Sequence, residues 1–456
     1  MKRCVRCLRI TSGHTEKSRK ISPMHKTAVC APTVALADAM DQAEAESAGK
    51  ASIIADPNEY PRGGIPAPRV FSSSPHILVA SDYMRQNVKS TRQIILMISE
   101  NCNLRCKYCY ESFKSDHQMS VDTAIRLLRH EFDRLGKTPE IKFLSIIFLG
   151  GEPLLNFGLI REVTKWICEN PPIVPFELST RTNGTLLSDE MKSWFFDNKE
   201  KIQLGLSLDG LGEMQKKGRT HLPVDIDFFA RNWPKNRVNI VLFNDTVQYL
   251  SDAVLSFRDK GILFSTDIAC GIRWTPEAAA SMEEQLIDLI PLYVSDPDEA
   301  MESGLFKYSV KNFLSEEKFT ELPFCGDMTN IAAYDTDGTK YCCHMFTPLV
   351  IGKEKSTRFK NFTMRGKSIP IDGRCLKCPW VNECKICYAM NLKICGDICT
   401  SASPTTTCEA VKAVARACCR YFLENIKYCI ESDLYVPPDR IELAEKVFEL
   451  LNRDAS

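Results

Sequence analysis

Three closely spaced cysteines, Cys102, Cys106 and Cys109, have the residue type and the spacing to hold an iron–sulfur cluster. They lie in the segment ENCNLRCKYCYES. A cubane cluster has four irons, and each iron takes one thiolate ligand. Three cysteines would therefore hold three irons and leave the fourth iron open. An open iron can bind a substrate or a cofactor, as the open position of a catalytic zinc does.

The main alternative for these three cysteines is a structural zinc site. Such a site takes four protein ligands in tetrahedral geometry. No further Cys or His follows within this loop, and the nearest candidate is His117. The spacing therefore favours a cluster with an open iron.

A second group of cysteines lies between residues 325 and 408, where the sequence shows little periodicity. The intervals read Cys325-x12-Gly338-x4-Cys343, then Cys375-x2-Cys378-x5-Cys384-x2-Cys387, and finally Cys408. CxxC pairs suit zinc ribbons as well as iron–sulfur clusters, so the spacing alone leaves both interpretations open. In either case we expect a domain that is held by its metals rather than by an apolar core of its own.

The first three cysteines follow a short apolar run at residues 93–100, which predicts a buried strand. A helical pattern comes next at residues 120–135, with Ser120 as a candidate N-cap and Gly136 as a stop signal. Strands and helices then alternate, and the strand candidates are QIILMISE, IKFLSIIFLGG, FELSTRTNG, IQLGLSLDG, VNIVLF and ILFSTDIACGI. This alternation predicts parallel βαβ units and an open or closed α/β barrel. Such barrels carry their reactive groups on loops after the strands, which is where Cys102 lies.

The overall composition is that of an ordinary globular protein. The 456 residues are 44% hydrophobic and 25% charged, and Lys+Arg and Asp+Glu both number 58. We therefore expect neither nucleic acid nor a membrane as a partner, and no apolar run approaches the roughly 18 residues that a spanning helix needs. The 21 cysteines, with no apolar signal segment at the start, favour metal ligation in a cytoplasmic protein over secreted disulfides.

The chain divides into four parts by its patterns. Residues 1–90 show no sustained period, and we expect them to be disordered or weakly ordered. Residues 91–300 would form the barrel, and residues 301–430 the cysteine-rich domain, which ends in a helix. Residues 431–456 would form a last, C-terminal helix.

The segment CNLRCKYC, with the aromatic Tyr108 directly before the third cysteine, resembles the signature of the radical S-adenosylmethionine (SAM) superfamily. The resemblance implies a partial (β/α)6 TIM-like barrel with a C-terminal cysteine-rich iron–sulfur domain. It also implies a 4Fe–4S cluster whose open iron is chelated by the amino and carboxylate groups of SAM. In that family one electron from the reduced cluster breaks a C–S bond and releases a 5′-deoxyadenosyl radical. A reductant such as flavodoxin or ferredoxin would supply the electron.

Further segments at strand ends resemble the SAM contacts of this family. The GGEP motif would receive the SAM amino group, and its glycines would let the backbone approach a ligand closely. An arginine would pair with the SAM carboxylate, a task that suits a planar bidentate donor. The residues that the resemblance assigns to SAM binding are Tyr108 near the adenine, Gly150, Gly151, Glu152, Pro153, Asn183, Ser207 and Asp209 near the ribose and carboxylate, and Arg219.

The second group of cysteines resembles the SPASM extension, which carries two auxiliary 4Fe–4S clusters in many radical SAM enzymes that modify peptides or proteins. The resemblance assigns Cys325, Cys343 and Cys387 to the first auxiliary cluster, and Cys375, Cys378, Cys384 and Cys408 to the second. Two residues separate Cys384 from Cys387, where the family usually has three. The first auxiliary cluster has only three assigned ligands, so its fourth ligand stays open between Cys342, another residue and none.

The resemblance predicts a radical SAM enzyme that abstracts hydrogen from a peptide or protein substrate. One alternative is an anaerobic sulfatase-maturing enzyme that oxidises Cys or Ser to formylglycine. Enzymes of that type have an acidic residue after the cysteine that matches Cys343, where this chain has His344. An alternative from another class is a non-catalytic electron carrier or zinc-ribbon module, which would have no need of GGEP-type SAM contacts. The sequence does not name the substrate, the bond formed or the catalytic acid or base.

Overall fold

The computed structural model describes residues 90–317, 330–362, 371, 373–384, 387–396, 398 and 407–455. Cys325 and residues 1–89 therefore lie outside the described residues. The strands are β1 (Thr91–Ser99), β2 (Phe143–Gly150), β3 (Phe176–Thr182), β4 (Gln203–Leu206), β5 (Val238–Leu242), β6 (Phe264–Ile268), β7 (Ile331–Tyr334) and β8 (Lys340–Tyr341). The helices are α3 (Val121–Leu135), α4 (Phe157–Glu169), α5 (Asp189–Asp197), α6 (Glu213–Gly218), α7 (Ile226–Asn232), α8 (Leu250–Asp259), α9 (Pro276–Tyr293), α10 (Pro297–Glu302), α11 (Val310–Leu314), α12 (Pro348–Ile351), α13 (Lys353–Thr357), α14 (Gly373–Leu376), α15 (Tyr388–Cys395), α16 (Cys408–Glu431) and α17 (Pro438–Ala455).

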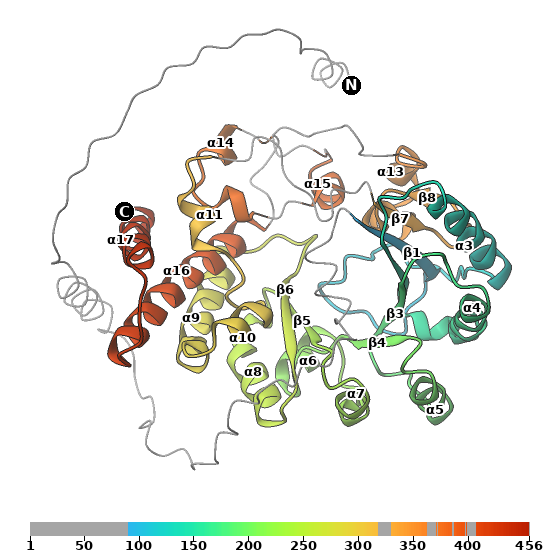
Figure 1. The fold of residues 1–456 in the computed structure, drawn as a ribbon, viewed down its shortest axis with the longest axis horizontal. Coiled ribbons are helices and arrows are strands. Elements are labelled where there is room, and N and C mark those ends of the chain that lie inside the picture. The colour runs from blue at the N-terminus through green and yellow to red at the C-terminus, as the bar shows by residue number, and fades with distance from the viewer. Residues whose placement is uncertain are drawn as a thin grey trace, which may run out of the picture. The chain divides into compact units, whose positions relative to one another are not determined.

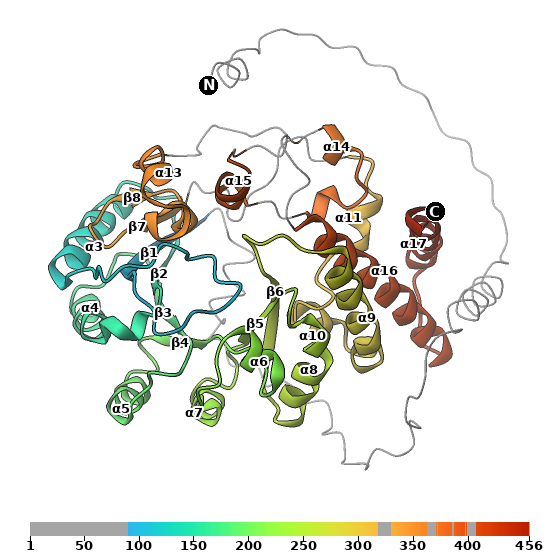
Figure 2. The ribbon, with the colours of Figure 1, turned by 180° about the vertical axis from the view of Figure 1, so that it is seen from behind.

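The strands form two sheets that are flanked by helices. One sheet has the order β4-β3-β2-β1-β7-β8, and the other holds β5 and β6. All neighbouring strands are parallel except β7 and β8, which form an antiparallel pair. Helices α4, α5, α7 and α8 lie along the outer side of the strands (Figures 1 and 2). The predicted α/β fold with a parallel sheet is confirmed.

The wall of the partial barrel is interrupted between β4 and β5. The two sheets meet at one isolated parallel bridge, between Ser207 and Asn239. β4 has only four residues, because the chain leaves the sheet at Ser207 and turns through Gly210, whose φ is +96°. The sequence pattern predicted the strands but not this break.

Local signals in the sequence mark the start and the end of α3 where expected. The Ser120 side chain accepts a hydrogen bond from the Thr123 N–H (3.1 Å), and Gly136 follows the last residue of α3. The predicted helices near residues 409–430 and at the C-terminus are confirmed as α16 and α17. α16 packs against α9, where Arg416 Nε lies 2.7 Å from Glu283 Oε2.

The apolar core includes the part of the cysteine-rich region that packs on the sheet. Ile95 and Met97 of β1 belong to one buried cluster with Tyr341, Leu349 and Tyr388. Residues 341–362 and 387–396 thus share an apolar cluster with β1 of the barrel, which the prediction of a domain held by its metals did not include. Its elements here are short, four residues in α12 and five in α13, so no helical period can develop in the sequence.

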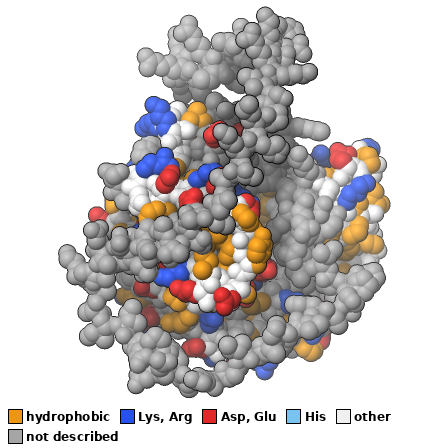
Figure 3. Space-filling model, turned by 60° about the vertical axis from the view of Figure 1, so that its left-hand side comes forward, with side chains coloured by type: hydrophobic (Ala, Val, Ile, Leu, Met, Phe, Trp, Pro, Cys, Tyr) orange, Lys and Arg blue, Asp and Glu red, His pale blue; other side chains and the backbone are white. Residues whose placement is uncertain are grey.

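The surface carries charges of both signs. On the face shown in Figure 3, Lys and Arg side chains are interspersed with Asp and Glu among the described residues. In the part of the chain that the structure describes, no helix has both the length and the apolar character needed to cross a membrane.

Candidate active site on the loop after the first strand

The three cysteines of the predicted first cluster lie on the loop that directly follows β1. Cys102 is buried, and Cys106 and Cys109 are half-buried. The Asn101 side chain accepts a hydrogen bond from the Cys102 N–H (2.8 Å). The Cys109 N–H donates to the Cys106 carbonyl (3.1 Å). Backbone hydrogen bonds therefore fix a short segment that carries all three thiols.

The three thiols lie close enough to influence one another. Burial raises the pKa of Cys106 to about 11, Arg219 opposes this increase, and the thiols of Cys109 and Cys102 add to it. Lys114 Nζ lies 3.4 Å from Cys109 Sγ. The Lys114 charge also opposes the increase that burial causes in the pKa of Cys102. A nearby ammonium favours the thiolate form, which is the form that ligates metals.

The donor set of this loop is three cysteine thiols, which is the ligand type of a cubane cluster. Within the described ranges, no three His, Cys, Asp or Glu side chains converge as the ligands of one ion would. In a cubane each thiolate binds a different iron, so the thiols need not converge on one point. Three thiols on one loop therefore match a cluster with one open iron.

The glycines of the GGEP motif bring the second strand end against the cysteine loop. A Cβ on Gly150 would lie 2.1 Å from the Ser99 carbonyl oxygen, and one on Gly151 would lie 2.3 Å from the Asn101 carbonyl oxygen. Gly150 also has a φ of +147°, which other residues rarely adopt. These glycines thus let the end of β2 approach residues 99–101 closely, and their predicted contact with SAM stays a prediction.

Glu152 is buried and its carboxylate is held by the next strand end. It accepts hydrogen bonds from the Thr182 hydroxyl (2.7 Å), the Asn183 N–H (2.9 Å) and the Leu154 N–H (3.2 Å). Burial raises the pKa of Glu152, and these donors oppose the increase. Pro153 is buried beside it at the start of a short 3-10 helix. The predicted SAM contact is therefore a fixed carboxylate that joins β2 to β3.

Asn183 ties the third strand end to the cysteine loop. Its Nδ2 donates to Asn103 Oδ1 (2.9 Å), and its Oδ1 accepts from the Thr185 N–H (3.0 Å). Ser207 directly follows β4 and forms a bridge to Asn239 of β5. The side-chain oxygen and one N–H of Asn183 are engaged by the protein, and the contact of Ser207 with SAM stays a prediction.

Asp209 organises the fourth strand end. Its Oδ2 accepts hydrogen bonds from the Tyr108 hydroxyl and from Arg219 Nε (3.0 Å), and its Oδ1 accepts from the Val241 N–H (2.9 Å). Burial alone would lower the pKa of Arg219, but the Asp209 carboxylate raises it above its ordinary value. Arg219 also lies over the Tyr108 ring, 5.3 Å from its centroid. Asp209 therefore positions two predicted SAM contacts rather than standing free for a ligand.

Four of the predicted auxiliary ligands lie together. Burial raises the pKa of Cys384 to about 12, and the thiols of Cys408, Cys378 and Cys375 add to this increase. Cys408 thus lies near three cysteines that precede it by 24 to 33 residues, which fits the predicted ligand set of the second auxiliary cluster. Whether they bind a cluster stays a prediction.

The predicted ligands of the first auxiliary cluster are only partly described. Cys343 and Cys387 contribute to the same apolar cluster on the inner face of β1. Cys325 lies outside the described residues. The motif residue Gly338, with a φ of +84°, forms the turn between β7 and β8.

Sequence reasoning missed two charged residues near the site. Lys114 follows Cys109 by five residues, and its position in the loop gave no pattern that singled it out. Arg181 of β3 is opposite Gly205 of β4, and its Nε is 3.5 Å from where a Cβ on that glycine would be. Alternation along β3, with Thr180 and Thr182 buried and Arg181 exposed, was a signal that could have identified Arg181.

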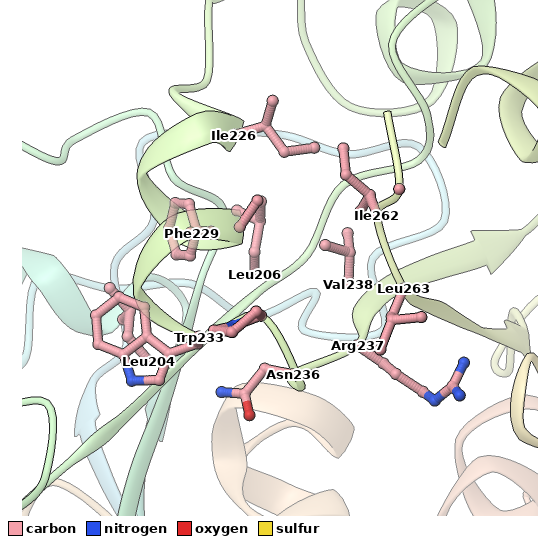
Figure 4. A pocket seen from close by; sticks show the side chains of 13 residues that line it. Leu204, Leu206, Ile226, Phe229, Trp233, Asn236, Arg237, Val238, Ile262 and Leu263 are labelled. Atoms are coloured by element: carbon pink, nitrogen blue, oxygen red, sulfur yellow. The ribbon is translucent and has the colours of Figure 1, made fainter. Parts of the chain in front are cut away.

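An apolar pocket lies elsewhere, between β4 and β5 (Figure 4). Its lining includes Leu204, Trp233, Val238 and Ile262, and none of the predicted site residues. Val238 begins β5, and Ile262 precedes β6, so the pocket lies at the strand ends opposite to the cysteine loop. The pocket coincides with the break between the two sheets and lies away from the candidate site.

Comparison with known proteins identifies the domain. Residues 96–283 match the model of the Radical SAM superfamily. An uncharacterized protein of Methanocaldococcus jannaschii is 28% identical over 39% of this chain and 63% of its own length. The cysteine-type anaerobic sulfatase-maturating enzyme of Clostridium novyi is 28% identical over 40% of this chain and 52% of its own length. The chain thus matches between half and two thirds of the length of these relatives.

A solved structure shows the same fold. Native anSMEcpe, with bound AdoMet and the Cp18Cys peptide, superposes with a TM-score of 0.50 at 17% identity, covering 78% of this chain and 99% of that protein. The cysteine-rich C-terminal part fits the SPASM extension that the sequence resembles. Residues 96–283, which carry the cysteine loop after β1, thus match the radical SAM superfamily.

Proposed function

We propose that this protein is an enzyme that reductively cleaves SAM and abstracts hydrogen from a peptide or protein substrate. The observation that carries the proposal is the joining of the three-cysteine loop to Glu152 and to the Asp209–Arg219 pair at neighbouring strand ends. A 4Fe–4S cluster and SAM, when bound, supply a 5′-deoxyadenosyl radical. The residues of the chain bind, orient and shield these groups.

Arg219 would bind the SAM carboxylate. Arg219 Nε donates a hydrogen bond to Asp209 Oδ2 (3.0 Å), and the other N–H groups of the guanidinium would bind the ligand. Tyr108 would pack near the adenine, and Asp209 fixes its hydroxyl. Glu152 would receive the SAM amino group, and its three protein donors hold the carboxylate in place for that contact. The preformed arrangement reduces the entropy cost of ordering SAM.

The proposal of a peptide or protein substrate draws on the relatives. Cysteine-type sulfatase-maturating enzymes are among them, and anSMEcpe was solved with a peptide bound. The two auxiliary clusters, on Cys325, Cys343 and Cys387 and on the group around Cys384, would take an electron or position the substrate. A cytoplasmic flavodoxin or ferredoxin is our proposal for the reductant.

Anaerobic sulfatase maturation is the second candidate function, and the sulfatase-maturating relative supports it. The acidic residue of that enzyme type is replaced here by His344. Burial lowers the pKa of His344 to about 4, so its imidazole is neutral at physiological pH. A half-buried neutral imidazole is a different group from a carboxylate base, which favours the broader proposal over this one.

The test is release of 5′-deoxyadenosine. Anaerobically reconstituted protein with dithionite and SAM should release it, and the C102A/C106A/C109A variant should not. Replacement of the exposed Cys168, on α4, with Ala serves as the control and should leave release unchanged. An electron carrier or zinc module would release none in any variant, and undiminished release by the triple variant would refute the site assignment.

A further inference from the structure

Lys114 lies beside the third cysteine of the loop after β1, and its ammonium is buried. Its Nζ lies 3.4 Å from Cys109 Sγ. It also donates a hydrogen bond to the Glu111 carbonyl (3.0 Å) and lies 3.5 Å from Glu111 Oε2. An ammonium has three N–H donors, which is also the number of these acceptors. Only 9% of the Lys114 side chain is exposed, so water has little access to the contact with the thiol.

The backbone is anchored on both sides of Lys114, so the approach of its side chain to the thiol is built into the fold. The Phe113 N–H donates a hydrogen bond to the Leu349 carbonyl of α12 (3.0 Å). The Ser115 hydroxyl donates one to Glu100, the residue that directly follows β1. Lys114 is therefore held between two residues whose own contacts are with the strand end and with α12.

The contact involves one of the three thiols of the loop. Among the described residues, Cys102 Sγ accepts a hydrogen bond from the Leu104 N–H (3.4 Å), and Cys109 Sγ accepts one from Lys114. The first donor is a neutral backbone group, whereas the second carries a positive charge. A charged donor makes a stronger hydrogen bond than a neutral one, and exclusion of water strengthens it further.

A cation beside a ligand of an iron–sulfur cluster affects the reduction potential of the cluster. Hydrogen bonds to the sulfurs, net charge and solvent exposure together set that potential. The reduced cluster carries one more negative charge than the oxidised cluster, so a cation stabilises the reduced form more. The Glu111 carboxylate opposes this effect, but the Lys114 ammonium outweighs it because it contacts Cys109 Sγ directly.

We infer that Lys114 raises the reduction potential of the cluster on Cys102, Cys106 and Cys109 through its contact with Cys109 Sγ. The inference rests on the proposed function, which assigns the cluster to these three cysteines. The step concerned is the transfer of one electron from the reductant to the cluster, in which no bond breaks and no proton moves. Lys114 is a positioning residue that acts through Cys109, and it allows a weaker electron donor to reduce the cluster.

The experiment is a reductive titration of the anaerobically reconstituted full chain, followed by EPR spectroscopy. Dithionite is the reductant, and redox mediators set the solution potential at each point. The signal of this cluster is the component that the C102A/C106A/C109A variant lacks. The measured quantity is the ratio of reduced to oxidised cluster at each potential, which gives the midpoint potential of the cluster.

Two variants of the loop isolate the effect of the contact. Lys114→Met removes the ammonium and keeps a long, unbranched side chain. At the midpoint potential of the unaltered protein, its ratio of reduced to oxidised cluster should be lower by about tenfold. For a one-electron couple that change corresponds to about 59 mV. Lys107→Met is the matched control, since the Lys107 side chain is 55% exposed and solvent screens its charge. Its ratio should equal that of the unaltered protein.

The E111Q/K114M variant replaces Lys114→Met if that variant does not fold. It removes the carboxylate together with the ammonium, so no buried charge is left unpaired, and its ratio should change in the same direction. Equal midpoint potentials in the Lys114 and Lys107 variants would overturn the inference and leave the proposed function intact. A C102A/C106A/C109A variant that keeps every cluster signal would overturn both.

Discussion

Asp209 illustrates, at the scale of single residues, how a buried carboxylate can order a site. Only 1% of it is exposed, and it holds the Tyr108 hydroxyl, Arg219 and the Val241 N–H at once. Breaking a buried pair leaves the partner charge without compensation, which costs far more than losing a surface pair. Asp209 therefore holds Arg219 in the position from which its remaining N–H groups would reach a ligand.

Replacing Asp209 with Asn should lower the free energy of unfolding by about 3 kcal/mol. It should also weaken SAM binding about tenfold or more, because Arg219 and Tyr108 lose their shared anchor. Asp245→Asn is the control, since Asp245 makes a half-exposed pair with Lys107 at 3.6 Å. That change should stay within about 0.5 kcal/mol. Chemical denaturation and calorimetric SAM titration measure both effects, and equal behaviour of the two variants would contradict this role of Asp209.

The sequence predicted the residue types of this site better than their contacts. Tyr108, Asp209 and Arg219 were each assigned to SAM from their motifs, and the structure brings them together. Their mutual bonds could not be foreseen, because a side-chain network depends on packing between strands rather than on spacing within one. Lys114 was missed for the same reason, since its approach to Cys109 depends on how the loop folds back.

Among the elements, the approach of β2 to the loop after β1 depends on two glycines. A methyl group on Gly150 would overlap the Ser99 carbonyl at 2.1 Å, so the strand ends would have to separate. Gly150→Ala should lower the free energy of unfolding by about 3 kcal/mol or more and reduce cluster occupancy. Gly158→Ala is the control, because a Cβ at that position on α4 would have no heavy atom within 4 Å. This variant should increase the free energy of unfolding by up to about 1 kcal/mol. A Gly150→Ala protein with full iron and normal stability would show that the close approach is dispensable.

The turn that follows β7 makes stability depend on pH. Burial raises the pKa of Asp335 from 3.8 to about 7; the Thr336 N–H opposes this increase, and Glu100 adds to it. Between pH 4 and 7 the folded chain therefore keeps a proton that the unfolded chain has lost. The free energy of unfolding should therefore fall as pH rises through this window. Above the window, the folded protein bears the full cost of burying the ionised Asp335 carboxylate.

Asp335→Asn should remove this pH dependence. Relative to the unaltered protein, the variant should gain about 1 to 3 kcal/mol between pH 5 and pH 8. Asp337→Asn, at an exposed position in the same turn, should leave the profile unchanged. Thermal unfolding midpoints measured across this range test the expectation, and parallel profiles for all three proteins would refute it.

The elements themselves were predictable where their periods are long. β1 is a continuous apolar run, and α3 and α16 have long amphipathic patterns with clear ends. The strand and the two helices could therefore be predicted from the sequence. The break after β4 could not be predicted, because the four residues of β4 look like any short strand. The apolar packing of residues 341–362 was missed because its helices are too short to show a period.

At the scale of the whole molecule, one part of the cysteine-rich region is held by apolar packing, and another part is proposed to be held by metal ligation. Residues 341–362 pack on β1, whereas Cys375, Cys378 and Cys384 lie in a segment with short elements and come together with Cys408 at the start of α16. The C378A/C384A variant should lose about four irons and become sensitive to proteolysis between residues 373 and 408. Residues 341–362 should stay protected by the barrel. Retention of full iron and of the wild-type cleavage pattern would remove these cysteines from the proposed cluster.

The most direct measurement of the central claim is the EPR spectrum of the reduced protein before and after addition of SAM. The claim is that the cluster on Cys102, Cys106 and Cys109 has one open iron, to which SAM binds. SAM should therefore shift the signal of that cluster, and the C102A/C106A/C109A variant should lack both the signal and the shift. Reduced protein whose cluster signals are identical with and without SAM would contradict the account.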